Sequence, residues 1–268
     1  MKLGLVQMRV SADKAENLSR AKAAVKRLAE RGAEFVVLPE MFCCPYENSA
    51  FPVYAEGFGR GVTTALSDIA REYQLYLVGG SIPEREGDAI YNTSFVFSPE
   101  GECIARHRKA HLFDVNIPNG QVFCESDTLT AGDAVTVFDT AFGKVGLCIC
   151  FDIRFPELCR KMALLGANLI VCPAAFNRTT GPMHWELLFR ARAVDNQVFV
   201  CGVSSAADES ASYVAYGHSI AVNPWGEVLV QAGEEEGEYL VEFEPRNVEK
   251  VRASLPLLSG LRPNLYKL

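Results

Sequence analysis

Cys150 stands where an apolar segment gives way to a turn, a position from which a thiol could do chemistry. It closes the apolar run 145–149 and precedes residues 151–158, which read as a turn into a helix. Such a turn exposes its side chain and leaves helical N–H groups unpaired, which suits a nucleophile. The alternative is a packed thiol. Packing is the expectation for Cys148, Cys172 and Cys201, three more of the chain's nine cysteines.

Two charged residues are the candidate partners of this thiol. Glu40 directly follows the apolar segment 35–39, and ligands of α/β sheets bind at the carboxyl ends of strands. A partly buried glutamate has a raised pKa that suits proton transfer, although an ordinary loop carboxylate is the alternative. Lys109 lies in a basic patch, residues 106–114. An ammonium group fixed there could stabilise the negative charge that develops on a carbonyl oxygen.

Other chemistries have weaker signals. His107 and His111 could pair with a catalytic cysteine, but neither has an obvious orienting partner in the sequence. The chain has no G-x-S-x-G elbow, and the glycines at 57, 59 and 61 lack the strand that precedes a dinucleotide fingerprint. The cysteines and histidines also lack zinc-ligand spacing. We therefore expect no metal site and no dinucleotide-binding site.

Composition narrows the class of protein. With 49% hydrophobic and 22% charged residues, the 268-residue chain can bury a large core, and we expect one domain over residues 1–268. The net charge of −7 disfavours nucleic acid and anionic membranes as partners, which leaves small molecules. The N-terminus lacks a secretory signal pattern and the apolar runs are too short to span a membrane. We expect a cytoplasmic protein.

The order of the elements indicates an α/β fold built from two similar halves. Short β-branched runs alternate with amphipathic helices, such as the one expected over residues 13–31 with Gly32 as its C-terminal cap. After about residue 140 the same order returns. The corresponding pairs are residues 3–8 and 145–150, 36–40 and 169–174, 75–81 and 198–204, and the hairpins 91–106 and 219–231. Unrelated strands of similar composition are the alternative.

Two such halves predict the layers of the fold. Each half covers one face of its sheet with helices and must cover the other face, which packing sheet on sheet achieves. We therefore expect a four-layer α-β-β-α sandwich of two mixed sheets with pseudo-two-fold internal similarity. Residues 109–133 have few regular signals, and long irregular segments in compact domains are often functional.

Three motifs around the candidate residues resemble those of the nitrilase superfamily of carbon-nitrogen hydrolases. They are LPEMF at Glu40, RKAHLFD at Lys109 and CICFDIRFPEL at Cys150, and the resemblance spans nearly the whole chain. Glu125 matches a further acidic residue near that family's catalytic centre. The stretches AGD, FNRTTGPMHWELL, RARAVDNQVFV and SYVAYGHS are most similar to the omega-amidase branch. That branch hydrolyses the terminal amide of alpha-ketoglutaramate and alpha-ketosuccinamate to the dicarboxylate and ammonia.

The resemblance implies a mechanism, the sandwich fold and a homodimer joined through helices. Glu40 would take the proton of Cys150, whose thiolate would form a thioester with the substrate. Lys109 and the backbone N–H of Phe151 would stabilise the oxyanion, and Glu125 would orient Lys109 or the incoming amide. No metal or organic cofactor takes part in this chemistry.

A small amide that carries a distant carboxylate suits a forked cation, and Arg154 is our candidate. Its alternative role is an ion pair with Asp152 or Glu157. Arg178 is a second candidate cation, and Trp185 is expected in the core or the dimer interface. The residues expected to supply aromatic walls and hydroxyl donors to the substrate are Tyr46, Phe176, Thr179 and Thr180.

Two other functions compete with this assignment. Residues 42–46 depart from the polar residues usual before Pro-Tyr, so a related amidase acting on deaminated glutathione or an N-carbamoyl compound is one alternative. Nitrile hydrolysis is disfavoured because the branch motifs resemble those of amidases. A non-catalytic binding protein of the same fold is the other alternative, and the intact Glu40, Lys109 and Cys150 argue against it.

Overall fold

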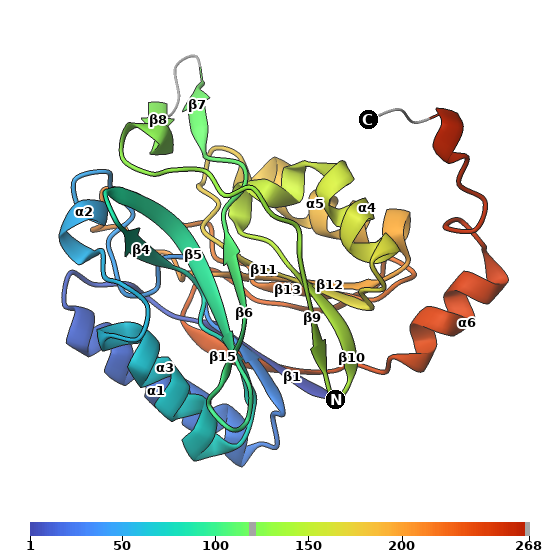
Figure 1. The fold of residues 1–268 in the computed structure, drawn as a ribbon, viewed down its shortest axis with the longest axis horizontal. Coiled ribbons are helices and arrows are strands. Elements are labelled where there is room, and N and C mark those ends of the chain that lie inside the picture. Colours follow the sequence, from blue (N-terminus) through green and yellow to red (C-terminus); the bar gives the residue numbers. More distant parts are fainter. Residues whose placement is uncertain (118–121, 266–268) are drawn as a thin grey trace.

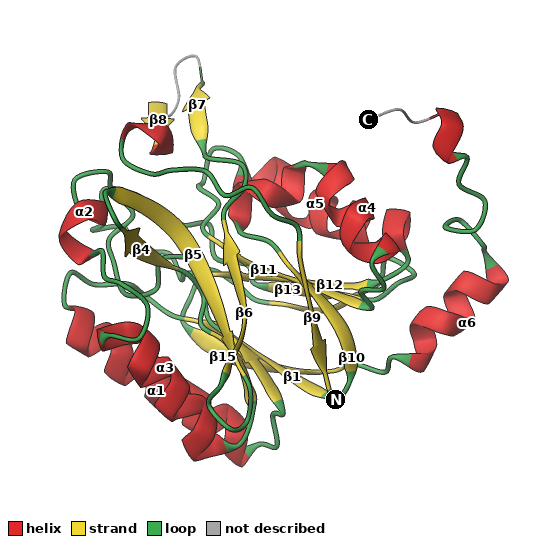
Figure 2. Ribbon diagram, in the orientation of Figure 1, coloured by secondary structure: helices red, strands yellow, loops and turns green. Residues whose placement is uncertain are grey.

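Two mixed β-sheets lie face to face with helices on their outer faces in the computed structural model, which describes residues 1–117 and 122–265 (Figures 1 and 2). Helices α1 (Lys14–Glu30) and α3 (Gly61–Tyr73) cover the first sheet. Helices α4 (Pro156–Leu164) and α5 (Gly181–Asn196) cover the second. This arrangement confirms the predicted α-β-β-α sandwich.

Each sheet combines three parallel strands with antiparallel ones. The first sheet contains β15 (Gly237–Glu242), β1 (Lys2–Gln7), β2 (Phe35–Val37), β3 (Tyr76–Val78), β5 (Ala89–Phe97), β4 (Ile82–Glu86) and β6 (Cys103–Arg108), the last two both paired with β5. The second has the order β14 (Val228–Gln231), β13 (Ile220–Val222), β12 (Phe199–Ser204), β11 (Leu169–Ala174), β10 (Gly143–Leu147) and β9 (Thr136–Thr140).

The two sheets repeat one topology, which confirms the predicted internal similarity. Strands β1, β2 and β3 run parallel in that order, as do β10, β11 and β12. An antiparallel hairpin follows each set, β5–β6 in the first sheet and β13–β14 in the second. An antiparallel strand also flanks each first parallel strand, β15 beside β1 and β9 beside β10.

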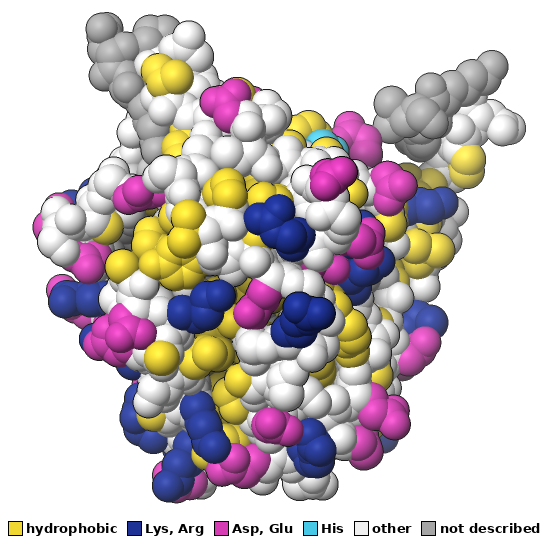
Figure 3. Space-filling view, turned by 60° about the vertical axis from the view of Figure 1, so that its left-hand side comes forward, with side chains coloured by type: hydrophobic (Ala, Val, Ile, Leu, Met, Phe, Trp, Pro, Cys, Tyr) yellow, Lys and Arg dark blue, Asp and Glu magenta, His cyan; other side chains and the backbone are white. Residues whose placement is uncertain are grey.

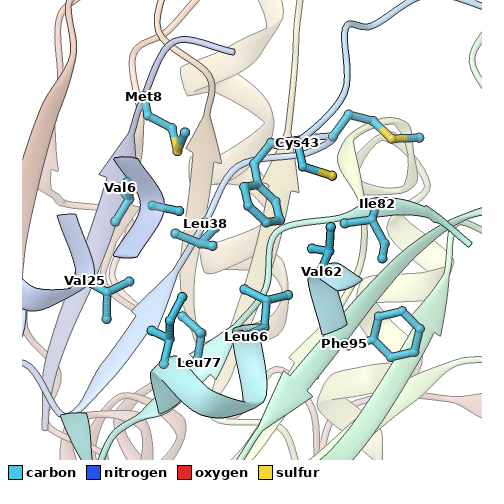
Figure 4. Close-up of a cluster of buried hydrophobic side chains, with 14 of the residues drawn as sticks. Val6, Met8, Val25, Leu38, Cys43, Val62, Leu66, Leu77, Ile82 and Phe95 are labelled. Carbon is cyan, nitrogen blue, oxygen red and sulfur yellow. The ribbon is translucent and has the colours of Figure 1, made fainter. Parts of the chain in front are cut away.

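Burial on both faces explains why the central strands read as unbroken apolar runs. In β2, Phe35 and Val37 pack between the sheets while Val36 packs under the helices. In β11, Leu169 and Val171 face the other sheet while Ile170 contacts the helical side. The cluster between the first sheet and its helices includes Val6, Val25, Leu38, Leu66 and Leu77 (Figure 4).

Helix α1 begins where the sequence predicts. The Oδ1 atom of Asp13 accepts hydrogen bonds from the N–H groups of Ala15 (2.8 Å) and Glu16 (3.1 Å), which caps the helix. Gly32 follows with φ +86°, a conformation that favours glycine.

The remaining elements are short or peripheral. A hairpin of β7 (Asp114–Asn116) and β8 (Val122–Cys124) projects from the sandwich and is followed by the 3₁₀ helix η1 (Glu125–Asp127) (Figure 1). Helix α2 is Phe51–Tyr54 and η2 is Cys150–Arg154. Helix α6 (Arg246–Ser254) and η3 (Pro263–Leu265) lie to the side of the sandwich (Figure 1).

The surface carries both signs of charge. On the face drawn in Figure 3, basic and acidic side chains are interspersed with apolar ones. Across the part of the chain that the structure describes, no helix is long and apolar enough to cross a membrane.

A tight approach between two loops makes Gly80 critical for the position of Glu40. Gly80 has φ +59°, and a Cβ atom there would lie 2.1 Å from the carbonyl oxygen of Pro39, the residue before Glu40. Gly87 has the same φ of +59°, but a Cβ atom would meet nothing within 4 Å. An alanine at either position would therefore suffer the same backbone strain, but only an alanine at position 80 would also collide with a neighbouring atom.

We expect Gly80→Ala to destabilise the protein and reduce its activity, because the Pro39 carbonyl must move. Gly87→Ala should cost only the backbone strain, roughly 1–2 kcal/mol. Urea unfolding and rates of amide hydrolysis compare the two variants. Equal losses of stability and activity in both would contradict this steric account.

Candidate active site

Four segments of the chain bring Glu40, Tyr46, Lys109, Glu125 and Cys150 into one buried cluster. Glu40 follows β2, Lys109 follows β6, Glu125 begins η1, and Cys150 begins η2 three residues after the end of β10. The Lys109 side chain has no exposed area and Cys150 is only 5% exposed. The structure therefore brings together the acidic, basic and thiol residues that the sequence predicted as catalytic.

Lys109 lies between two carboxylates. Its Nζ atom is 2.9 Å from Glu40 Oε1 and 2.9 Å from Glu125 Oε2. Lys109 Nζ also donates a hydrogen bond to the Tyr46 hydroxyl at 3.2 Å. That hydroxyl in turn donates a 2.6 Å hydrogen bond to Glu125 Oε1. The backbone N–H of Phe113 donates to Glu125 Oε2 at 2.7 Å. A charged lysine that is buried away from solvent needs such partners to compensate for its lost hydration. Here the same contacts also fix the position of the ammonium group.

The two oxygens of Glu40 have different surroundings. Oε1 accepts hydrogen bonds from Lys109 Nζ at 2.9 Å and from Asn92 Nδ2 at 2.8 Å. Oε2 is buried and has no hydrogen-bond partner among the described residues. The thiol of Cys150 is nevertheless close enough to lower the pKa of Glu40. Oε2 is thus the oxygen that is available to exchange a proton with the thiol.

Electrostatics favour a protonated thiol beside a basic carboxylate. Burial raises the pKa of Glu40, with the Lys109 charge opposing and the Glu125 charge adding to this shift. Burial by itself would lower the pKa of Lys109, but Glu125 and Glu40 outweigh it and raise that pKa well above its usual value. Burial and the Glu40 charge together raise the pKa of Cys150 well above the usual thiol value. The resting site therefore keeps its ammonium charged and its thiol protonated.

The turn at Cys150 has the geometry of a nucleophile elbow. Cys150 has φ +47°, in the left-handed region that non-glycine residues rarely adopt. Ile149 before it is extended, with φ −125°. Phe151 is the second residue of η2, so its N–H lies in the first turn, where helical N–H groups have no partner within the helix. The turn thus places a thiol next to a backbone N–H that has no hydrogen-bond partner within the helix.

Arg154 lies beside the nucleophile without a carboxylate partner among the described residues. Its Nη1 atom is 3.0 Å from His184 Nδ1. Its guanidinium packs over the rings of Phe176 (4.5 Å) and Phe151 (5.6 Å). Asp152 instead binds His107 and His111, so the alternative pairing of Arg154 with Asp152 is absent. Arg154 therefore keeps its capacity to bind an anion.

Only some of the other predicted pocket residues line the cavity beside Cys150. A small cavity beside the nucleophile is lined by Phe113, Cys150, Phe151, Arg154, Ala175, Phe176, Asn177, Thr180 and Tyr213. Thr179 is outside this lining. Arg178 forms surface ion pairs with Glu209 and Glu234, which leaves it a weaker candidate than Arg154. Trp185 is buried and packs on Phe176 and Phe189 in the core.

Sequence reasoning missed two residues of the site. Asn92 on β5 donates to Glu40, and the buried polar run 92–94 in an otherwise apolar strand was its signal. Tyr213 packs on Tyr46 with ring centroids 4.5 Å apart and donates a 2.6 Å hydrogen bond to the Ala175 carbonyl. Tyr213 lies in a segment without regular structure, and its only signal was its place in the stretch SYVAYGHS, which does not single it out.

A second cavity of about 390 Å³ approaches the site from the side of Glu40. Glu40, Tyr46, Ala175 and Tyr213 are among its lining residues, whereas Cys150 and Arg154 are not. Ala175 and Tyr213 line both cavities, so they separate the carboxylate side of the site from the thiol side. Over the described ranges, no group of three or more His, Cys, Asp or Glu side chains could hold a metal ion.

A sandwich of this kind with a buried cysteine, glutamate and lysine defines a hydrolase of the α/β class with an active-site cysteine. The carbon-nitrogen hydrolase family model matches residues 2–253, and the chain belongs to this family, within the nitrilase superfamily. The family expected from the three motifs is thereby confirmed.

Known relatives agree over the full length. The chain is 48% identical to omega-amidase NIT2 of Bos taurus over 266 residues, which cover 99% of this chain and 96% of the relative. The crystal structure of Saccharomyces cerevisiae Nit3 matches with a TM-score of 0.89 and 42% identity, covering 96% of this chain and 95% of that one.

A more distant structure concerns the cysteine itself. A glutamate-to-glutamine variant of the amidase from Nesterenkonia sp. AN1 matches with a TM-score of 0.81 and 26% identity, covering 99% of this chain and 95% of that one. That structure shows covalent addition of the acetamide moiety of fluoroacetamide at its active-site cysteine.

We expect Glu40→Gln to lower the pKa of Cys150, because the Glu40 charge raises that pKa and the Lys109 charge lowers it. The pH dependence of iodoacetamide labelling at Cys150, followed by peptide mass spectrometry, measures the change. Turnover should fall by roughly 10²–10⁴-fold, since glutamine cannot accept a proton. Cys150→Ala is the control for labelling at this position. A labelling midpoint that stays in place or rises in Glu40→Gln would refute the electrostatic account.

Proposed function

We propose that this chain is an omega-amidase, which hydrolyses the terminal amide of alpha-keto acid monoamides such as alpha-ketoglutaramate and alpha-ketosuccinamate. The products are the dicarboxylate and ammonia. The observation that carries the proposal is Arg154, a cation beside Cys150 with no carboxylate partner among the described residues. The full-length similarity to omega-amidase NIT2 supports the same conclusion.

The acylation half of the reaction follows from the positions of Glu40 and Lys109. Glu40 Oε2 takes the Cys150 proton, and the thiolate attacks the amide carbon. Lys109 Nζ and the Phe151 N–H stabilise the tetrahedral oxyanion, and losing one such donor costs roughly 3–4 kcal/mol in other acyl-transfer enzymes. Glu40 then protonates the leaving nitrogen, ammonia departs and a thioester remains.

The deacylation half uses the same residues. Glu40 takes a proton from water, and the resulting hydroxide attacks the thioester carbon. Collapse of this second tetrahedral intermediate releases the carboxylic acid, and the Cys150 thiolate regains its proton from Glu40. Glu125 and Tyr46 orient the Lys109 ammonium throughout, as their 2.9 Å and 3.2 Å contacts with Nζ support.

Arg154 is proposed to select the substrate. A guanidinium can form two parallel hydrogen bonds with a carboxylate, and Arg154 Nε is buried without a partner among the described residues. The guanidinium lies over the rings of Phe176 and Phe151, neither of which can accept its N–H groups as a carboxylate would. Ala175 and Tyr213 line both the cavity beside Arg154 and the cavity of about 390 Å³ beside Glu40, and the latter volume suits a small amide better than a peptide-sized one.

A substrate panel tests the assignment. Wild-type protein should hydrolyse alpha-ketoglutaramate faster than deaminated glutathione or N-carbamoyl-beta-alanine. A preference for either of the last two compounds would replace the proposed substrate with one of the related amidase activities. A protein that hydrolyses none of them and does not react at Cys150 would be a binding protein of the same fold.

Arg154→Gln is expected to raise the KM for alpha-ketoglutaramate by roughly 10- to 100-fold, because a charge-assisted contact of about 1.5–3 kcal/mol is lost. A short neutral amide such as propionamide should be affected far less. Arg178→Gln is the matched control, since Arg178 is already paired with Glu209 and Glu234. If the neutral and charged amides lose activity equally, Arg154 does not bind the carboxylate.

We also propose a homodimer that forms through the outer helices of the second sheet. Several apolar side chains on α4 and α5 are exposed, of which Met183 is 73% and Leu187 64% exposed. The others are Leu164 and Val194, and Leu165, which directly follows α4, is exposed as well. Apolar groups gathered on neighbouring helices typify protein–protein interfaces.

A single domain and a cytoplasmic location stay predictions.

Leu187→Arg is expected to shift the protein from a dimer to the 29.4 kDa monomer, because it places a charge in the proposed interface. Sedimentation equilibrium measures the mass. Val53→Arg is the control, since Val53 is also exposed but lies on α2 over the first sheet. A monomeric wild-type protein, or equal dissociation in both variants, would refute this interface.

A further inference from the structure

Asp152 is a fully buried carboxylate that the proposed mechanism does not use. It lies two residues after Cys150 and accepts four hydrogen bonds. Oδ2 accepts from His107 Nε2 and from the Ile149 N–H, each at 3.0 Å. Oδ1 accepts from His111 Nδ1 at 2.7 Å and from the His111 N–H at 2.9 Å. All four lone-pair sites of the carboxylate are therefore occupied.

The donors to Asp152 come from both sides of the catalytic cluster. His107 and His111 lie two residues before and two residues after Lys109. Ile149 is the residue before Cys150. One carboxylate therefore joins the segment that carries the ammonium, at the end of β6 in the first sheet, to the turn that carries the thiol, after β10 in the second.

Further contacts fix the two histidines. The His111 ring stacks on Phe155 with centroids 3.6 Å apart and planes inclined by 10°. His107 Nδ1 is 2.9 Å from the Thr136 hydroxyl on β9. Because a carboxylate only accepts, His107 must carry a proton on Nε2 and His111 a proton on Nδ1. The network thus defines both ring orientations.

We infer that Asp152 is a positioning residue that sets the distance between the Lys109 ammonium and the Cys150 sulfur, acting through His107, His111 and the Ile149 N–H. This inference rests on the catalytic roles proposed above for Lys109 and Cys150. The left-handed φ of Cys150, +47°, needs a local restraint, and the Ile149 hydrogen bond to Asp152 provides it. The ionised form is the one required. Burial alone would raise the pKa of Asp152, but the hydrogen bonds from His107 and His111 outweigh it and hold that pKa well below its usual value.

An asparagine cannot replace this carboxylate. It offers one acceptor oxygen and one NH₂ donor, whereas each Asp152 oxygen faces one backbone N–H and one histidine N–H. A histidine can change its tautomer to accept from the NH₂ group, but a backbone N–H cannot. In Asp152→Asn, either orientation of the side-chain amide would therefore release the turn before Cys150 or the segment after Lys109.

The test compares Asp152→Asn with Glu84→Gln, which alters another buried carboxylate outside the catalytic cluster. Glu84 binds Thr93, Arg106 and Arg108, so its loss controls for general destabilisation. For Asp152→Asn we expect kcat on alpha-ketoglutaramate to fall by roughly 10- to 100-fold, as for other residues that orient catalytic groups, with KM nearly unchanged. Iodoacetamide labelling of Cys150 at one fixed alkaline pH should also slow, because a displaced Lys109 no longer lowers the thiol pKa.

Two substitutions at His111 test the same link where the fold tolerates Asp152→Asn poorly. His111→Asn keeps a side-chain N–H near the Nδ1 position, whereas His111→Phe keeps the stacking on Phe155 without a donor. The inference requires that His111→Asn retains more kcat and faster labelling than His111→Phe. The reverse order would show that stacking, and not the bond to Asp152, matters.

The inference is overturned if Asp152→Asn lowers the melting temperature but leaves kcat and labelling unchanged, or if Glu84→Gln reduces kcat as strongly. Labelling of Cys150 does not depend on the substrate, so failure of the inference is distinguishable from failure of the omega-amidase proposal. A wild-type protein that prefers another short amide would change the substrate of the kinetic assay and leave the comparison intact.

Discussion

The charge of Lys109, held without solvent between Glu40 and Glu125, is the interaction on which the rest of the site depends. Moving an ammonium ion out of water costs several kcal/mol, which only well-placed partners can offset. Because two carboxylates and the Tyr46 hydroxyl meet at one nitrogen, the segments that carry them are fixed relative to one another. The proposed oxyanion donor is thereby in place before a substrate binds, which is the condition for electrostatic catalysis.

The two buried oxygens of Glu40 have different roles. Its Oε1 atom serves the structure through Lys109 and Asn92, while Oε2 faces no standard donor among the described residues. Burial raises the pKa of Glu40 and so increases its affinity for the proton that, in the proposed mechanism, it carries between sulfur and nitrogen. A solvated carboxylate with an ordinary pKa would be a poorer base in the step that takes the proton from the thiol.

Sequence patterns predicted the fold, whereas the proposed role of Cys150 also needed the family resemblance, because position alone left a packed thiol as the alternative. Apolar runs and their repeated order predicted the sandwich, and the turn after residues 145–149 predicted the exposed backbone at Cys150. The cluster around Lys109 needed the family resemblance, since its partners are 69 and 16 residues away. Asn92 was missed because the polar run 92–94 marks β5 as unusual but does not indicate that Asn92 contacts Glu40, 52 residues away in the sequence.

Whether Arg154 pairs with a nearby carboxylate or stays available to an anion depends on contacts that sequence spacing does not reveal. Sequence spacing allowed Asp152 as its partner, but Asp152 is occupied by His107 and His111, which reach it from the first half of the chain. Arg154 is left with His184 and two aromatic rings as neighbours, so its charge lacks a counter-ion among the described residues. In the proposed reaction the substrate carboxylate supplies that counter-ion. Recognition of the substrate and neutralisation of a partly buried cation then become one interaction, and a neutral amide of the same length would provide neither.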